Sequence, residues 1–133
     1  MKELMIKYAP FGAYQKAAVM NQMKPDVFAE ACPSRAVLAK IANKWSLLVI
    51  DALEDGPVRN GALMRRIEGI SQKMLTATLR ELEDLGLVSR RHLETVPPHV
   101  EYSLTPLGQS LRGAVCELDR WVENNLYAMR EIG

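Results

Sequence analysis

Cysteine is scarce in this sequence, with only Cys32 and Cys116 among 133 residues. Two cysteines so far apart indicate neither a disulfide framework nor a set of zinc ligands, and the simplest compartment for such a chain is the reducing cytosol. Long apolar runs are also missing, because no run approaches the ~20 residues that span a bilayer. The first residues lack the apolar core of a secretory signal. We therefore expect a cytoplasmic protein with no membrane segment, no disulfide and no metal site.

Net charge is nearly absent as well, since 17 Lys and Arg residues stand against 16 Asp and Glu residues, for a formal charge of +1. Any basic surface for an anionic partner must therefore be local. The sequence shows no Ser, His and Asp arrangement, no paired carboxylates and no Gly-rich phosphate loop, so we expect neither an enzyme nor a cofactor. A chain of this length predicts one domain, or one domain with an extension, and would gain stability from dimerisation.

Three helices are predicted in the first part of the chain. The first covers residues 13–23 and ends where Pro25 follows. Ser34 is expected to cap the second helix, which carries apolar residues at helical spacing. The third covers residues 44–53 and is apolar on most sides, which is typical of a buried helix.

A short helix, a tight turn and a longer helix follow. Asn60 is the expected cap of the short helix, and Gly69 supplies the positive φ of the turn. The longer helix begins at Ser71 and stops at Gly86. Its apolar stripe has helical spacing, at Leu75, Leu79 and Leu82. Two helices joined by a turn that contains glycine predict a helix-turn-helix.

A β-hairpin and a long helix complete the pattern. Strands are expected over residues 87–92 and 100–104, with a Pro-rich turn at residues 94–98. Thr105 caps the last helix, and its apolar stripe continues for about six turns. A stripe of that length exceeds what one small domain needs to cover itself. We therefore expect a dimer contact at Leu111, Leu118, Val122, Leu126 and Met129.

The predicted fold is mainly α with a small antiparallel β-hairpin, a winged helix-turn-helix that dimerises through its N- and C-terminal helices. Residues 1–31 form a helical N-terminal extension that takes part in the dimer contact. Residues 32–105 form the DNA-binding domain, and residues 106–133 form the C-terminal dimerisation helix. The second helix of a helix-turn-helix enters the major groove and contacts base edges near its N-terminus. The expected partner is therefore double-stranded DNA with a near-palindromic sequence, bound by a homodimer.

The polar side chains in this region suit DNA. Gln, Lys, Arg and Thr side chains can each contact base edges, and cations at the wing can contact phosphate. Residues 59–73 carry four basic residues and one acid, whereas residues 106–133 carry three basic residues and four acids. The expected DNA contacts are Arg59, Arg65, Ser71, Gln72, Lys73, Thr76, Arg80, Arg90 and Arg91.

Two other interpretations remain open at this point. A helix with a Leu stripe and a polar outer face is also typical of an ordinary solvated helix. The fold also serves as a protein-interaction module without DNA binding. The coincidence of the turn, the hairpin and the local positive charge favours DNA.

Several motifs resemble one known family. They are residues 69–76, 79–83, 86–88 and 96–105, with Cys32-Pro33, Lys44-Trp45 and residues 56–59 upstream. Together they resemble the HxlR-type winged-helix regulators, relatives of the MarR group, over about residues 32–122. The resemblance implies a bacterial or archaeal dimeric regulator of transcription. Several members of that family sense electrophiles or oxidants through one N-terminal cysteine.

Cys32 is the residue that matches this sensing cysteine. A thiol near a helix N-terminus has its thiolate favoured by the helix dipole, and Arg35 is expected to add to the effect. The alternative is a small buried residue at a helix junction. The effector is then an electrophile or oxidant acting at Cys32, or else a small molecule or none.

Overall fold

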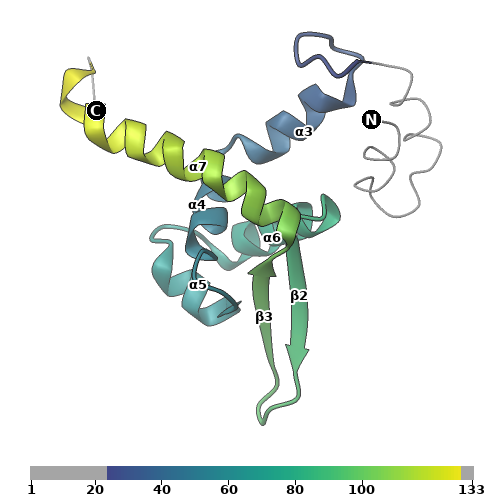
Figure 1. Cartoon of the computed structure of the whole chain (residues 1–133). Helices are drawn as coiled ribbons and strands as arrows, with labels where there is room; N and C mark the ends of the chain where they lie inside the picture. The colour runs from purple at the N-terminus through teal and green to yellow at the C-terminus, as the bar shows by residue number, and fades with distance from the viewer. Residues whose placement is uncertain (1–23, 130–133) are drawn as a thin grey trace.

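The computed structural model describes residues 24–129, in which four helices precede a hairpin and a long helix follows it. The helices are α3 (Pro33–Ile41), α4 (Lys44–Ala52), α5 (Asn60–Arg66), α6 (Gln72–Asp84) and α7 (Pro106–Asn125), and the hairpin strands are β2 (Val88–Leu93) and β3 (His99–Leu104). A short strand β1 (Val58–Arg59) and a final 3₁₀ turn η1 (Leu126–Ala128) complete them. Figure 1 shows the hairpin projecting from the core and α7 crossing over it. The predicted fold class is confirmed, whereas the helix expected at residues 13–23 lies outside the described residues.

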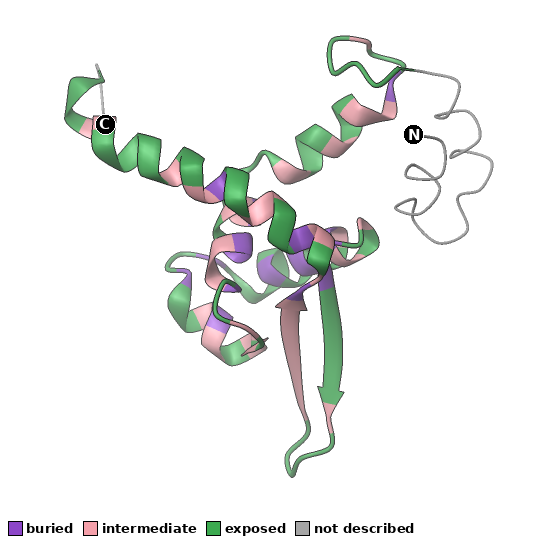
Figure 2. Cartoon of the chain, viewed as in Figure 1, coloured by how far each residue is buried: buried purple, intermediate pink, exposed green. Residues whose placement is uncertain are grey.

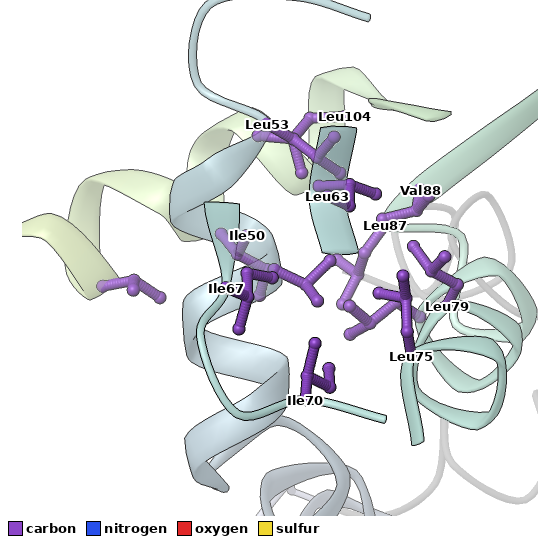
Figure 3. Packing of buried hydrophobic residues seen from close by; sticks show 13 residues of the cluster. Ile50, Leu53, Leu63, Ile67, Ile70, Leu75, Leu79, Leu87, Val88 and Leu104 are labelled. Atoms are coloured by element: carbon purple, nitrogen blue, oxygen red, sulfur yellow. The ribbon is translucent and has the colours of Figure 1, made fainter. Parts of the chain in front are cut away.

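The core sits where α4, α5, α6, the base of the hairpin and the first half of α7 meet (Figure 3). Burying each large aliphatic side chain in it stabilises the fold by roughly 1.5–3 kcal/mol. The predicted stripe of α6 is confirmed, because its three leucines are buried. The core consists of Val49, Ile50, Leu53, Leu63, Ile67, Ile70, Leu75, Leu79, Leu82, Leu87, Val88, Leu104 and Val115.

Side-chain caps fix the first turns of α6 and α7, as expected. Ser71 Oγ accepts a hydrogen bond from the Met74 N–H at 3.0 Å, at the start of α6. Thr105 Oγ1 accepts one from the Gly108 N–H at 3.1 Å, at the start of α7. The turn before α6 has Gly69 at φ +87°, in the left-handed region that glycine enters without steric cost.

Two predicted caps and one burial prediction are wrong. Cys32, not Ser34, is the N-cap of α3, because Pro33 has a fixed φ suited to the first helical position. Asn60 is the first residue of α5 rather than its cap, since β1 carries the chain in extended form through Arg59. Helix α4 is not buried on all sides, because Leu48 is 39% exposed.

The hairpin belongs to a three-stranded antiparallel sheet of order β1-β3-β2. The sequence did not predict β1, which is too short to show a period. In the ladder Arg90 lies opposite Tyr102, and Arg91 lies opposite Glu101. Tyr102 packs toward the core, so Glu101 belongs to the other face, as the predicted alternation required.

Helix α7 has two halves with different surroundings. Val115 is buried, and Leu111 packs against the same core. Further along, Leu118 is 47% exposed and Trp121 is 56% exposed. Figure 2 shows the second half of α7 largely in the colour of exposed residues. The regular helix ends at Asn125, earlier than the predicted stripe, so Leu126 and Met129 follow it in and after η1. Within the described part of the chain, every helix is too short or too polar to span a bilayer.

Candidate nucleic-acid interface

Helix α6 presents a polar face opposite its buried leucines. Gln72, Lys73, Thr76 and Arg80 are all exposed, as the stripe predicted. Gln72 Nε2 donates a hydrogen bond to Thr76 Oγ1 at 3.0 Å, which links two of these side chains one turn apart. The helix is held from behind by α4, against which it packs. The polar face of α6 is therefore exposed, while the opposite face of the helix is held by α4.

The N-terminus of α6 is suited to an anionic or acceptor-rich partner. Its first turn contains Lys73 and no acid, and its cap Ser71 is exposed. Free backbone N–H groups and the helix dipole give this end a partial positive charge. The acids Glu81, Glu83 and Asp84 gather at the opposite end of the helix.

The basic residues of the stretch 59–73 do not all lie on one face. Arg59, next to the start of α5, and Arg65, in its last turn, are exposed. Arg66 instead lines a cavity beside α7 together with Glu68. One cation and the single acid of this stretch thus lie at the same cavity, and the positive excess of the stretch is carried by Arg59, Arg65 and Lys73.

Arg90 and Arg91 point to opposite faces of the wing, since successive strand residues alternate. Arg90 Nε lies 3.6 Å from a carboxylate oxygen of Glu83, and Arg91 Nη1 lies 3.7 Å from one of Glu101. Exposed pairs of this kind contribute little to stability, with a median of ~0–1 kcal/mol. Both arginines can therefore exchange these partners for phosphate at small cost, and the Arg91 side chain is the more exposed at 77%.

Cys32 is a buried thiol at the start of α3, with 5% of its surface exposed. The Asp26 N–H donates a hydrogen bond to Sγ at 3.3 Å, and Ser34 Oγ lies 3.1 Å from Sγ. These hydrogen bonds, first that from Asp26 and then those from Ser34, lower the pKa of the thiol. Arg35 has no part in this lowering, contrary to expectation. Both cysteines have free thiols.

The expected dimer residues divide between two environments. Leu111 faces the protomer core, and Leu118, Val122 and Met129 are exposed. Leu126, in η1, is partly exposed. Trp121 is exposed next to Val122 and was missed in the sequence, although its spacing from Leu118 places it on the same side of the helix. Exposed apolar side chains thus lie along the second half of α7, at Leu118, Trp121 and Val122, and beyond it at Met129.

The chain matches a family of known regulators over most of its length. Residues 40–130 match the HxlR-like helix-turn-helix family. The uncharacterized HTH-type transcriptional regulator YtfH of Escherichia coli (strain K12) is 44% identical over 112 residues, which is 84% of this chain and 89% of that protein.

Two solved structures have the same fold. The transcriptional regulator ytfH from Salmonella typhimurium aligns with a TM-score of 0.75 and 45% identity, over 79% of this chain and 94% of that chain. The redox regulator HypR in its oxidized form aligns with a TM-score of 0.65 and 40% identity, over 71% of this chain and 97% of that chain. With its winged helix-turn-helix, this chain belongs to the HxlR-like helix-turn-helix family of transcriptional regulators.

Proposed function

We propose that the protein binds specific double-stranded DNA as a homodimer, with α6 of each protomer in the major groove of a near-palindromic site. The observation that carries this proposal is the exposed polar face of α6, whose N-terminus is capped and free of acids. We expect it to act in the cytoplasm, where the DNA of a bacterial or archaeal cell lies.

Within this site, we assign each side chain to DNA bases or to the DNA backbone. Gln72 suits adenine, Lys73 suits guanine, and the Thr76 methyl suits the thymine methyl. Ser71 and Arg80, at the two ends of this face, fit backbone contacts. Arg59, Arg65, Arg90 and Arg91 are assigned to phosphate, where they fix register and orientation without reading sequence.

A homodimer is supported by the apolar side chains that the described protomer leaves uncovered. They gather on the second half of α7, and Leu111 borders them where it enters the core. Residues 106–133, with residues 1–31, would then serve assembly, and residues 32–105 would serve DNA binding. Two recognition helices in a fixed arrangement explain a near-palindromic site.

A second function, sensing of electrophiles or oxidants, is favoured by the environment of Cys32. Its hydrogen bonds favour the thiolate, the reactive form. One structural relative is a redox regulator in an oxidized form. A small-molecule effector is the alternative signal.

The experiment that tests DNA binding selects preferred duplexes from a random pool and then measures their affinity. We expect Lys73→Ala to weaken binding to the selected duplex by ~1–3 kcal/mol. Binding to mixed-sequence DNA should weaken much less. Lys40→Ala removes one exposed cation from α3 and serves as the matched control. Failure to enrich any sequence, with no binding at low salt, would favour the protein-interaction module.

A further inference from the structure

Two side chains on the exposed face of α6 are joined to each other. Gln72 Nε2 donates a hydrogen bond to Thr76 Oγ1 at 3.0 Å, and both residues are exposed. They stand four residues apart, which makes them neighbours on one side of the helix. Because both belong to one helix, the protein makes this contact without any partner.

The backbone under these two residues is held in place. Ser71 Oγ accepts a hydrogen bond from the Met74 N–H, which closes the first turn of α6. Leu75, next to Thr76, and Leu79, one turn further along, are buried in the protomer core and anchor the helix there. What remains to be fixed at Gln72 is therefore the direction of its side chain.

Threonine is the stiffer of the two side chains. A β-branched side chain has few χ1 rotamers in a helix, so the position of Thr76 Oγ1 follows closely from the backbone. Glutamine has a long side chain, which loses much conformational freedom when it is held in place. The hydrogen bond therefore fixes Gln72 by means of Thr76, and not the reverse.

The hydrogen bond leaves the Gln72 amide able to read a base. A glutamine amide has two N–H groups on Nε2 and one acceptor, Oε1. Glutamine contacts adenine in the major groove by accepting from the N6 amino group and donating to N7. This pairing uses Oε1 and one N–H, so the other N–H is free for Thr76. The bond to Thr76 also decides which end of the amide is the donor and which is the acceptor.

We propose that Thr76 positions Gln72 for the reading of adenine, with the Thr76 hydroxyl oxygen holding one amide N–H so that Gln72 Oε1 and the other N–H face the base. This inference rests on the proposed function, because it requires that α6 lies in the major groove. A side chain that is already held loses less freedom on binding, so the contact favours affinity as well as the choice of base. Thr76 is thus a positioning residue that acts through Gln72.

Two variants separate the hydroxyl group of Thr76 from its methyl group. Thr76→Val keeps the shape and a methyl group and removes the acceptor, whereas Thr76→Ser keeps the hydroxyl and removes the methyl group. The position is exposed, and the three residues have similar helix propensities, so both variants should keep the fold. Thr76→Val should weaken binding to the selected duplex roughly two- to tenfold, the cost of immobilising one long side chain.

The first test examines the hydrogen bond in the full-length protein without DNA. Nitrogen-15 relaxation of side-chain amide groups measures how firmly the Gln72 amide is held. We expect it to be equally ordered in the wild type and Thr76→Ser, and more mobile in Thr76→Val. The amide of Gln109, exposed on α7, is the reference and should be the same in all three proteins. Equal order of the Gln72 amide in the wild type and Thr76→Val would overturn the proposal.

The second test replaces each adenine of the selected duplex in turn with 7-deazaadenine, which has a C–H group in place of N7. In the wild type we expect one adenine of each half-site at which the replacement weakens binding. The loss should persist in Thr76→Ser, become smaller in Thr76→Val and vanish in Gln72→Ala. Replacing thymines with deoxyuridine, which lacks the methyl group, is the matched control, and its effect should be the same in the wild type and Thr76→Val.

The outcomes separate this inference from the proposed function. An equal loss on 7-deazaadenine in the wild type and Thr76→Val would overturn the positioning role. A selected duplex with no adenine sensitive to the replacement would overturn it as well, and DNA binding through α6 would stand in both cases. If no duplex is enriched, the proposed function fails instead, and the relaxation of the Gln72 amide still decides whether Thr76 holds that side chain.

Discussion

Gly108, near the start of α7, lies directly against the backbone of Leu87, at the base of the wing. A Cβ on Gly108 would overlap the carbonyl oxygen of Leu87 and lie 3.2 Å from Leu104 Cδ2. The same Leu87 carbonyl accepts a hydrogen bond from the Thr105 N–H at 3.0 Å. The close approach joins α7 to the hairpin, so the angle between helix and wing depends on the absence of a side chain at this position.

The contact predicts opposite outcomes for two glycines of the same helix. Gly113→Ala should stabilise the protein by roughly 0.5–1 kcal/mol, because its site is exposed, with no described atom within 4 Å, and alanine favours helix. Gly108→Ala should instead destabilise it by ~1–3 kcal/mol, because backbone must move to admit the methyl group. Urea unfolding of both variants measures the difference. A gain in stability for Gly108→Ala would show that α7 can shift freely on the wing.

The wing arginines should differ in their effect on binding to DNA. Arg91 is the more exposed, and its pair with Glu101 is weak, so we expect it to contact phosphate. Arg91→Ala should reduce the slope of log affinity against log salt concentration by about 0.9, the value for one lost phosphate contact. Arg90→Ala should reduce it less, because Arg90 points to the face of Glu83. Arg35→Ala, which removes an exposed cation from α3, is the control. An unchanged slope in Arg91→Ala would rule out the phosphate contact.

The periodic parts of the molecule could be predicted from the sequence, and the long-range contacts could not. The spacing of Leu75, Leu79 and Leu82 predicted both α6 and its exposed face, because one buried stripe fixes the opposite surface. Strand β1 has two residues, which is too few to show a period, and its pairing with β3 depends on the tertiary fold.

The same limit applies to the charged residues. Arg66 entered the charge count of residues 59–73 although it lines the cavity beside α7, because sequence position does not say which side of α5 a residue occupies. Asp51 of α4 and Asp119 of α7 line one cavity, and nothing in the sequence signalled this, since each carboxylate looks like an ordinary helix surface residue until α4 and α7 pack together.

The exposed apolar side chains of α7 predict how the dimer can be broken. Leu118→Glu should give a folded monomer, because it places a charge among Leu118's apolar neighbours without touching the protomer core. Gln109→Glu adds the same charge to α7 at an exposed position half a turn round the helix, and should leave assembly unchanged. Sedimentation at micromolar concentration measures both. A Leu118→Glu protein that remains dimeric would place the interface on another surface.

Cys32 should be the thiol through which oxidants act. Its pKa is lowered by hydrogen bonds from Asp26 and Ser34, so more of it is thiolate at neutral pH than for an ordinary cysteine. Only 5% of the Cys32 surface is exposed, so large reagents reach the thiol poorly. Hydrogen peroxide and diamide are therefore better probes than bulky alkylating agents. We therefore expect diamide treatment to change the affinity of the wild type for its selected DNA.

The structural reason is local to the start of α3. A bond formed at Sγ removes the thiolate charge and weakens Sγ as an acceptor for the Asp26 N–H and as a partner of Ser34, so the segment before α3 is held less firmly to the helix. Cys32→Ser should abolish the response to diamide, whereas Cys116→Ser should keep it, and mass spectrometry should find the modification at Cys32. An equal response in wild type and Cys32→Ser would contradict the sensing role. DNA binding would still stand, since it depends on α6 and the wing.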